Sequence, residues 1–291
     1  MSACNGELSV FYGIPYIIFS ENNSAVGASL ISGTRDSLVR FWVHFSLVIL
    51  GFLIAIVTFF GQLFKPAPYG KHASGSGRFP VPVRLAFAIS ETLPGIIIFT
   101  LTYFLAGENF PGPPNIVMYC LFTLHYIHRG LIHPVVTRYS RNKVALWIPL
   151  STLVANLLYH YINAEFIGSA FYCDGYLYDP RFLIGIILFV VGFIINRAAD
   201  TQIICLRKSM KDKEYVIPKG PLFFLISNPN YFGEGLQWFG WAIMTWSLSG
   251  LVWWLFTEAT FIPRARHNHK WYKNQFLDYP PRRKALIPLI Y

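Results

Sequence analysis

Long apolar runs separated by short polar segments dominate the chain. They predict membrane-spanning helices near residues 39–63, 85–105, 115–136, 144–170 and 182–206. The apolar stretch 235–262 is too long for one span, and the Ser-Leu-Ser-Gly sequence at 247–250 predicts a turn between two shorter helices. We therefore expect an all-α polytopic membrane protein with seven transmembrane helices. A short N-terminal segment at 1–38 precedes the transmembrane domain, which with its loops and tail takes up 39–291.

Charge divides the loops into two groups. The chain has 24 Lys and Arg against 14 Asp and Glu. The basic residues concentrate in the loops after the first, third and fifth spans and in the tail from Arg264, whereas the other loops hold almost none. The positive-inside rule therefore predicts a lumenal N-terminus and a cytosolic C-terminus. The cytosolic face would also attract anionic ligands, although setting the topology accounts for many of these charges.

Composition agrees with the membrane interpretation. The chain is 54% apolar and 18% aromatic, with a mean hydropathy of +0.43, which is too apolar for a soluble protein of 291 residues. The four cysteines, Cys4, Cys120, Cys173 and Cys205, have neither CxxC nor zinc spacing, so we expect unpaired thiols and no metal. A Cys4–Cys173 disulfide requires both residues on the oxidising side. The glycosylation sequon at Asn22 has meaning only if that end is lumenal.

The third predicted span contains an unusual group of polar residues, His125-Tyr126-Ile127-His128-Arg129. On a helix His125, His128 and Arg129 fall on one side. Ionisable groups at bilayer depth are costly and commonly face a functional cavity. His128 and Arg129 at the cytosolic end of a helix could instead extend into lipid headgroups, but Tyr126 lies deeper. The motif is therefore the first candidate for a catalytic site.

The last third of the chain has the polar density of a cofactor site, without a Rossmann glycine fingerprint, P-loop, HExxH or GxSxG sequence. Asn196 and Asp200 share a helix face, and Arg207 follows two turns later. Further polar and aromatic residues lie at 215, 227–234, 264–272 and 278–288. Guanidinium groups suit phosphates, and amides and carboxylates suit ribose hydroxyls. The pattern indicates either a dinucleotide phosphate site between helices or a surface that binds headgroups.

Several motifs together resemble the steroid 5α-reductase (3-oxo-5α-steroid 4-dehydrogenase) family. The resemblance covers roughly 65–291 and is carried by the sequences at 68–72 (Pro-Tyr-Gly-Lys-His), 125–129, 196–200, 230–234 and 278–288. It implies a multi-pass reductase of the endoplasmic reticulum membrane, active in steroid and lipid metabolism. Such an enzyme uses NADPH to reduce the Δ4 double bond of a 3-oxo steroid that enters from the bilayer. The expected partners are this cofactor, a steroid or other lipid substrate and membrane lipids, with no nucleic acid.

The resemblance also implies roles for individual residues. Tyr126 would hydrogen-bond the C3 carbonyl, and Glu91 would assist it. A phenol backed by a carboxyl group can stabilise the charge that builds on the carbonyl oxygen as hydride adds to the β-carbon, typically a factor of about 10² to 10⁴ in rate. The implied NADPH contacts are Tyr69, Arg129, Arg141, Asn196, Asp200, Arg207, Tyr215, Asn230, Glu234, His267, Tyr272 and Arg283.

The chain departs from the family pattern at two places. Glu91 stands three residues before Pro94, whereas the family has its glutamate two residues before the proline. One residue turns a helix by about 100°, so Glu91 is either rotated away or restored by a local bulge. Asn268 interrupts a run of histidines in the tail, which leaves the cofactor contact of His267 open. Both departures are compatible with an altered substrate.

Other activities fit parts of the pattern. A trans-2-enoyl-CoA reductase of fatty acid elongation performs related chemistry, but those enzymes resemble ubiquitin at the N-terminus, for which 38 residues are too few. An isoprenylcysteine-type methyltransferase is architecturally related, and the motif at 125–129 does not favour it. A non-enzymatic seven-span protein that binds lipid or sterol would show no dependence on NADPH.

Overall fold

The structure is a computed structural model, and it describes residues 27–65, 79–106, 112–139, 142–209 and 215–291. Helices account for most of these residues. Their bounds are α1 Gly27–Phe64, α2 Val83–Thr92, η3 Leu93–Ile98, α3 Phe99–Ala106, α4 Pro113–Tyr126, η4 Ile127–Ile132, α5 His133–Val136, α6 Trp147–Ser169, η5 Asp174–Tyr178, α7 Pro180–Ser209, α8 Pro221–Leu225, α9 Pro229–Thr245 and α10 Leu248–Gln275. The predictions for Cys4, Asn22, Tyr69 and Arg141 lie outside the described residues.

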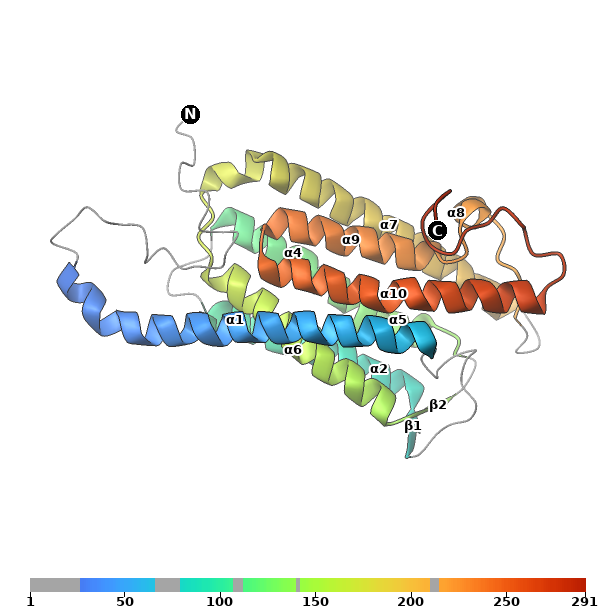
Figure 1. Ribbon diagram of the computed structural model, residues 1–291, viewed down its shortest axis with the longest axis horizontal. Coiled ribbons are helices and arrows are strands. Elements are labelled where there is room, and N and C mark those ends of the chain that lie inside the picture. Colours follow the sequence, from blue (N-terminus) through green and yellow to red (C-terminus); the bar gives the residue numbers. More distant parts are fainter. Residues whose placement is uncertain (1–26, 66–78, 107–111, 140–141, 210–214) are drawn as a thin grey trace.

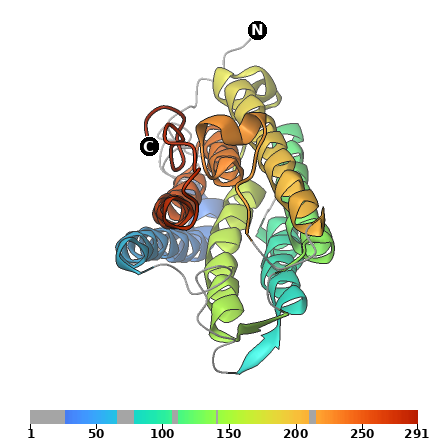
Figure 2. The same cartoon turned by 90° about the vertical axis from the view of Figure 1, so that its right-hand side faces the viewer.

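The long helices pack side by side along the long axis of the molecule (Figures 1 and 2). The turn expected at 247–250 is confirmed, because α9 ends at Thr245 and α10 begins at Leu248. Trp246 adopts a left-handed conformation with φ of 46°, and the Ser247 hydroxyl then accepts a hydrogen bond from the Gly250 amide at 2.9 Å. This cap satisfies one of the free amides at the start of α10, so the chain reverses within two residues.

A two-stranded sheet corrects the all-α expectation. β1 (Pro80–Pro82) pairs antiparallel with β2 (Lys143–Ala145), and both strands lie in segments that the sequence predicts as loops or loop borders. Three residues are too few to show the alternation of a strand, so only the pairing between distant segments reveals this sheet.

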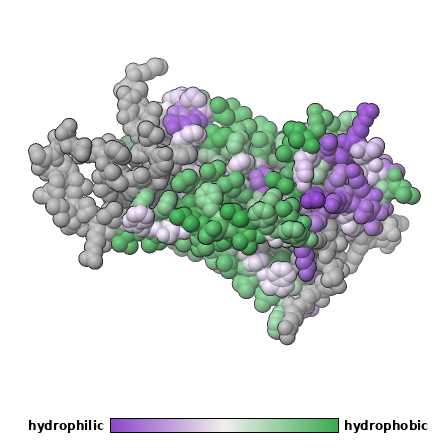
Figure 3. Space-filling view, in the orientation of Figure 1, coloured by the Kyte–Doolittle hydropathy of each residue, from purple (hydrophilic) through white to green (hydrophobic). Residues whose placement is uncertain are grey.

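The outer surface of the bundle is apolar over most of its length. Large hydrophobic side chains remain exposed, such as Val57 and Leu105, which are 71% and 79% exposed. Figure 3 shows that they form a broad band, and that hydrophilic side chains gather at the end that carries the C-terminal tail. Three of the described helical stretches are long and apolar enough to cross a membrane: Val39–Phe64, Val83–Ala106 and Pro180–Arg207. These features are those of a membrane protein.

Glycines allow α7 and α9 to approach closely. A Cβ atom on Gly192 would lie 2.4 Å from the backbone nitrogen of Gln237, and one on Gly233 would lie 2.5 Å from that of Asn196. Small residues at such crossings are characteristic of helices that pack within membranes. The close approach places polar side chains of α7 directly against those of α9.

One cysteine differs from the sequence prediction. Cys173, between α6 and α7, is disulfide-bonded, so the expectation of unpaired cysteines is wrong at this position. Cys120 and Cys205 are free, as expected. Spacing alone did not reveal the bond, because it depends on which residues the fold brings together.

Candidate active site

Two π-helical segments lie beside the motif at 125–129. η3 begins two residues after Glu91, and η4 follows Tyr126 directly. A Cβ atom on Gly95 would lie 2.3 Å from the Tyr126 ring, and one on Gly130 would lie 2.3 Å from the Thr92 hydroxyl, so η3 packs closely on the end of α4 and η4 on the end of α2. A π-helical turn accommodates one extra residue in a helix. The additional residue before Pro94 therefore coincides with a local bulge, one of the two alternatives that its spacing left open.

Arg129 lies between two carboxylates. Its Nε atom is 3.7 Å from Glu91 Oε1, and its Nη1 atom is 4.0 Å from Glu234 Oε2. Asn156 of α6 donates a hydrogen bond to the other oxygen of Glu91 at 3.2 Å. The contacts join α2, η4, α6 and α9 at one point, and opposite charges offset the cost of burying each ion. Arg129 contacts acidic side chains here instead of lipid headgroups.

Three further residues that the sequence predicts, Asn196, Asp200 and Asn230, come together beside Arg129. Asn196 Nδ2 donates to the Asn230 carbonyl at 2.8 Å and to Glu234 Oε2 at 3.1 Å. Asn230 Nδ2 donates to Asp200 Oδ1 at 3.1 Å. We call the connected set the Arg129 cluster; its members are Glu91, Arg129, Asn196, Asp200, Asn230 and Glu234.

Tyr126 lies next to this cluster with its hydroxyl available. The side chain is 2% exposed, and its ring packs against those of Phe122 and His160 at centroid distances of 4.9 and 4.4 Å. Within the described part of the chain no residue hydrogen-bonds its hydroxyl. The charges of Glu91 and Arg129 act on the phenol electrostatically. A hydroxyl without a partner in this position can bind a polar group of a ligand.

The structure adds residues that sequence reasoning missed. Arg197 contacts the side chains of His128 and Asn196, and its Nη2 atom is 3.9 Å from Asp200 Oδ2. His133 Nε2 is 3.7 Å from the same Asp200 oxygen. The signal that could have identified Arg197 is a charge at the end of a long apolar run.

A second group of predicted cofactor residues lies nearer the tail. The Arg207 guanidinium is 5.9 Å from the centroid of the Tyr215 ring, and this ring contacts Trp271 at 5.0 Å. Cations over aromatic faces are favourable and leave guanidinium hydrogens free for an anion. The arrangement suits an aromatic or phosphate-bearing ligand.

Arg283 occupies a buried position beside two stacked tyrosines. Tyr272 and Tyr279 stack with ring centroids 5.6 Å apart, and the Arg283 guanidinium lies 5.2 Å from the Tyr279 centroid. Arg283 donates to the Pro218 carbonyl at 3.3 Å, while its Nε atom has no hydrogen-bond partner among the described residues. A buried guanidinium with an unused donor fits a phosphate oxygen.

The tail histidines separate into different environments. His267 Nε2 lies 2.9 Å from the Gln62 carbonyl of α1, away from the residues just described. His269 instead contacts the Ser227 hydroxyl through Nδ1 at 2.7 Å, and burial lowers the pKa of His269 to about 4. A neutral imidazole can therefore accept this hydrogen bond at neutral pH. Asn268 donates to Asn228 Oδ1 at 2.9 Å. His269 therefore contacts Ser227, whereas the predicted cofactor residue His267 contacts α1.

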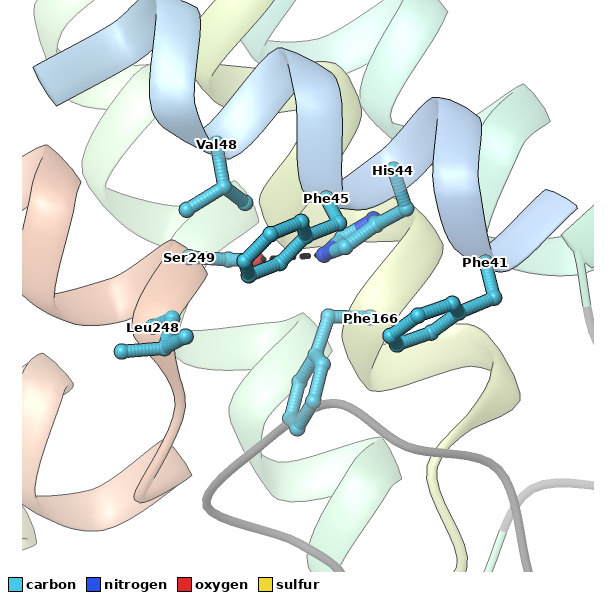
Figure 4. Close-up of a pocket in the computed structure, with 7 residues that line it drawn as sticks. All are labelled: Phe41, His44, Phe45, Val48, Phe166, Leu248 and Ser249. Carbon is cyan, nitrogen blue, oxygen red and sulfur yellow. Dashed lines mark hydrogen bonds between the residues drawn. The ribbon is translucent and has the colours of Figure 1, made fainter.

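A different polar group lines a hollow at the start of α10 (Figure 4). The hollow has a volume of about 230 Å³ with the open space at its mouth and is lined by Phe41, His44, Phe45, Val48, Phe166, Leu248 and Ser249. His44 lies between Glu165 and Ser249, with Nδ1 2.6 Å from Glu165 Oε2 and Nε2 2.9 Å from Ser249 Oγ. Arg40 Nη2 is 3.4 Å from Glu165 Oε1. We call Arg40, His44, Glu165 and Ser249 the Glu165 cluster.

A helical bundle with an apolar surface and an internal, multiply charged cluster is typical of a membrane protein with a candidate functional site inside the bundle. Residues 147–291 match the family model described as 3-oxo-5-alpha-steroid 4-dehydrogenase. The chain belongs to this family, which is a family of oxidoreductases.

Its relatives match over most of their length. The steroid 5-alpha-reductase DET2 of Gossypium hirsutum is 39% identical over 260 residues, which cover 85% of this chain and 97% of that protein. The 3-oxo-5-alpha-steroid 4-dehydrogenase 1 of Bos taurus is 36% identical over 228 residues, covering 77% of this chain and 88% of the relative. The protein of the same name from Homo sapiens is 35% identical over 227 residues, with 77% and 86% covered.

Proposed function

We propose that this enzyme uses NADPH to reduce the Δ4 double bond of 3-oxo-Δ4-steroids, giving 5α-steroids. The names of its relatives support the substrate class. The observation that carries the proposal is Tyr126, whose side chain is buried beside the Arg129 cluster and whose hydroxyl forms no hydrogen bond with a described residue. A conjugated ketone needs such a donor at its oxygen, because negative charge builds there when hydride adds to the β-carbon.

Tyr126 would donate its hydrogen bond to the C3 carbonyl of the steroid. Glu91 would hold the phenol in position, and is itself held by Asn156 and by the charge of Arg129. Packing of the Tyr126 ring against Gly95 would fix the direction of the hydroxyl. Preorganised donors of this kind lower the barrier because they need no rearrangement as charge develops.

The residues present fit NADPH, which would supply the hydride when bound. The unused Nε donor of buried Arg283 and the half-buried position of Arg207 suit phosphate groups. The described residues that would hold the cofactor are Arg129, Asn196, Asp200, Arg207, Tyr215, Asn230, Glu234, Tyr272 and Arg283. The roles of Tyr69 and Arg141 stay predictions, and His267 faces α1.

We also propose seven transmembrane spans in the endoplasmic reticulum membrane, with a lumenal N-terminus. The spans would be α1, α2 to α3, α4 to α5, α6, α7, α9 and α10. The alternation of basic loops supports this orientation, and so does a disulfide at Cys173, since disulfides persist in oxidising compartments. Adding a glycosylation tag to each end and expressing the protein in microsomes tests it. A glycosylated C-terminal tag would overturn both the orientation and a cytosolic cofactor site.

Turnover by membranes that contain the protein tests the activity. We expect NADPH-dependent formation of 5α-products from a panel of Δ4-3-oxo steroids, identified by mass spectrometry. A parallel incubation contains trans-2-enoyl-CoA, the substrate of the alternative reductase. Reduction of the enoyl-CoA without steroid turnover would contradict the proposal, as would steroid binding with no reduction.

A further inference from the structure

His160 of α6 is an unexplained polar group in the core. It is 0% exposed, and neither ring nitrogen has a hydrogen-bond partner among the described residues. The Pro94 carbonyl of η3 lies near enough to one ring nitrogen for a weak hydrogen bond, although it does not meet strict hydrogen-bond geometry, so at least one nitrogen stays without a partner. Leaving a buried polar group unpaired is destabilising, because its hydrogen bonds to water are lost and not replaced. Such groups are rare in folded proteins, and a bound ligand is one way to satisfy them.

The position of His160 connects it to the proposed chemistry. Its ring lies 4.4 Å from that of Tyr126, measured between centroids, and 5.3 Å from that of Trp253 in an edge-to-face arrangement. Trp253 Nε1 is likewise buried without a partner in the described part of the chain. Two unpaired groups from α6 and α10 therefore meet beside the tyrosine that would hold the substrate carbonyl.

The hydrogen-bonding capacity of the pair selects one kind of group. A neutral imidazole has one N–H donor and one acceptor nitrogen, and an indole has one donor. A hydroxyl group matches both, because its oxygen accepts from the Trp253 indole while its hydrogen is donated to the free nitrogen of His160. A carbonyl oxygen could accept but would leave the acceptor nitrogen unpaired. An apolar group would satisfy neither residue.

We propose that His160 and Trp253 form a subsite for a hydroxyl group of the substrate, separate from the carbonyl at Tyr126. The proposal rests on the proposed function and narrows its substrate class to 3-oxo-Δ4-steroids that carry a hydroxyl on the ring system. The hydroxyl would be bound equally in the ground state and the transition state, so the subsite would act mainly through KM.

Paired substrates test the subsite in the full-length enzyme. We would measure kcat and KM with NADPH for androst-4-en-3-one and for three derivatives that carry one hydroxyl, at the 11β, 16α or 17β position. For at least one derivative, wild-type kcat/KM should exceed that of the parent compound by about 10-fold or more. His160→Phe should remove this preference by raising KM for the hydroxylated derivative far more than KM for the parent compound. His160→Gln, which keeps a donor and an acceptor, should retain most of it.

Further variants separate a substrate contact from a structural role. Trp253→Phe should lose part of the preference, and His44→Phe, in the Glu165 cluster, should lose none. Equal losses on hydroxylated and parent substrates, or a wild-type enzyme without any preference, would overturn the subsite. Thermal stabilisation by the same four steroids, measured without turnover, gives an independent reading. No dependence on the hydroxyl there would also overturn it, whereas absent reduction of every steroid would contradict the proposed function instead.

Discussion

The Arg129 cluster and the Glu165 cluster both bury charged groups between apolar helices, yet they differ in how their groups are used. In the Glu165 cluster, Glu165 faces His44 and Arg40, and Arg40 also donates to the Ala106 carbonyl at 2.8 Å. Around Arg129, by contrast, the Tyr126 hydroxyl and Arg197 Nε lack partners among the described residues. Burial of charge alone therefore does not identify a reaction site, and the proposed site is distinguished by the Tyr126 hydroxyl that lies beside its charges.

The backbone differs between the two regions as well. The Glu165 cluster stands on the regular helices α1, α6 and α10, whereas the Arg129 cluster adjoins the π-helical segments η3 and η4. Such segments cost stability and are frequent at functional sites. The comparison suggests that the regular region holds helices together and the distorted region serves chemistry.

Loss of the Tyr126 hydroxyl should have the largest effect on catalysis. We expect Tyr126→Phe to lower kcat by about 10² or more, roughly 2.7 kcal/mol of transition-state stabilisation, because only the donor to the carbonyl is lost. Binding of NADPH and steroid should change little. Tyr103→Phe is the matched control, since this buried hydroxyl also lacks a partner among the described residues but packs against Tyr119. Full activity of Tyr126→Phe would remove the centre of the proposed mechanism.

The cofactor contacts should give the next largest effect. Arg207→Ala and Asn230→Ala are each expected to weaken NADPH binding by about 1.5–3 kcal/mol, the usual contribution of a hydrogen bond to a charged group. The KM for steroid should change less. Arg40→Ala, which removes a charge from the Glu165 cluster, serves as control. Unchanged NADPH binding in both variants, with the protein folded, would place the cofactor elsewhere.

Glutamates in the two clusters allow a direct comparison. Glu91→Gln should lower kcat by about 10-fold or more if its carboxylate supports the phenol of Tyr126. Glu165→Gln makes the same change in the other cluster and should leave kcat near that of the wild type. Near-normal turnover of Glu91→Gln would show that another group, such as Thr92 or a water molecule, supports the tyrosine.

Two glycines, Gly95 in η3 and Gly61 in α1, test how the distorted and the regular backbone tolerate a larger side chain. A Cβ atom on Gly95 would lie 2.3 Å from the Tyr126 ring, so Gly95→Ala should destabilise the fold by about 1–3 kcal/mol and reduce kcat. Gly61 of α1 has no neighbour within 4 Å of such an atom. Gly61→Ala should therefore stabilise its helix by up to about 1 kcal/mol. Thermal unfolding and kcat are measured for both variants. Equal unfolding temperatures and equal kcat values would contradict the close packing of η3 against Tyr126.

Local patterns in the sequence are enough to predict the long helices and part of the candidate site. Hydropathy placed the long helices, and the residues at 247–250 located the break between α9 and α10. The residues at 125–129 and the pair Asn196 and Asp200 stood out because charges within apolar runs are locally visible. Each of these features depends on neighbours within a few turns of the chain, which a linear pattern records.

Which polar side chains come together depends on the tertiary structure alone. The bulge that accompanies Glu91, the different surroundings of His267 and His269, the pairing of β1 with β2 and the bond at Cys173 all follow from contacts between distant segments. His160 gave no signal in the sequence because its significance lies in what surrounds it and in the partners it lacks. Helix packing sets those surroundings, and no local periodicity encodes them.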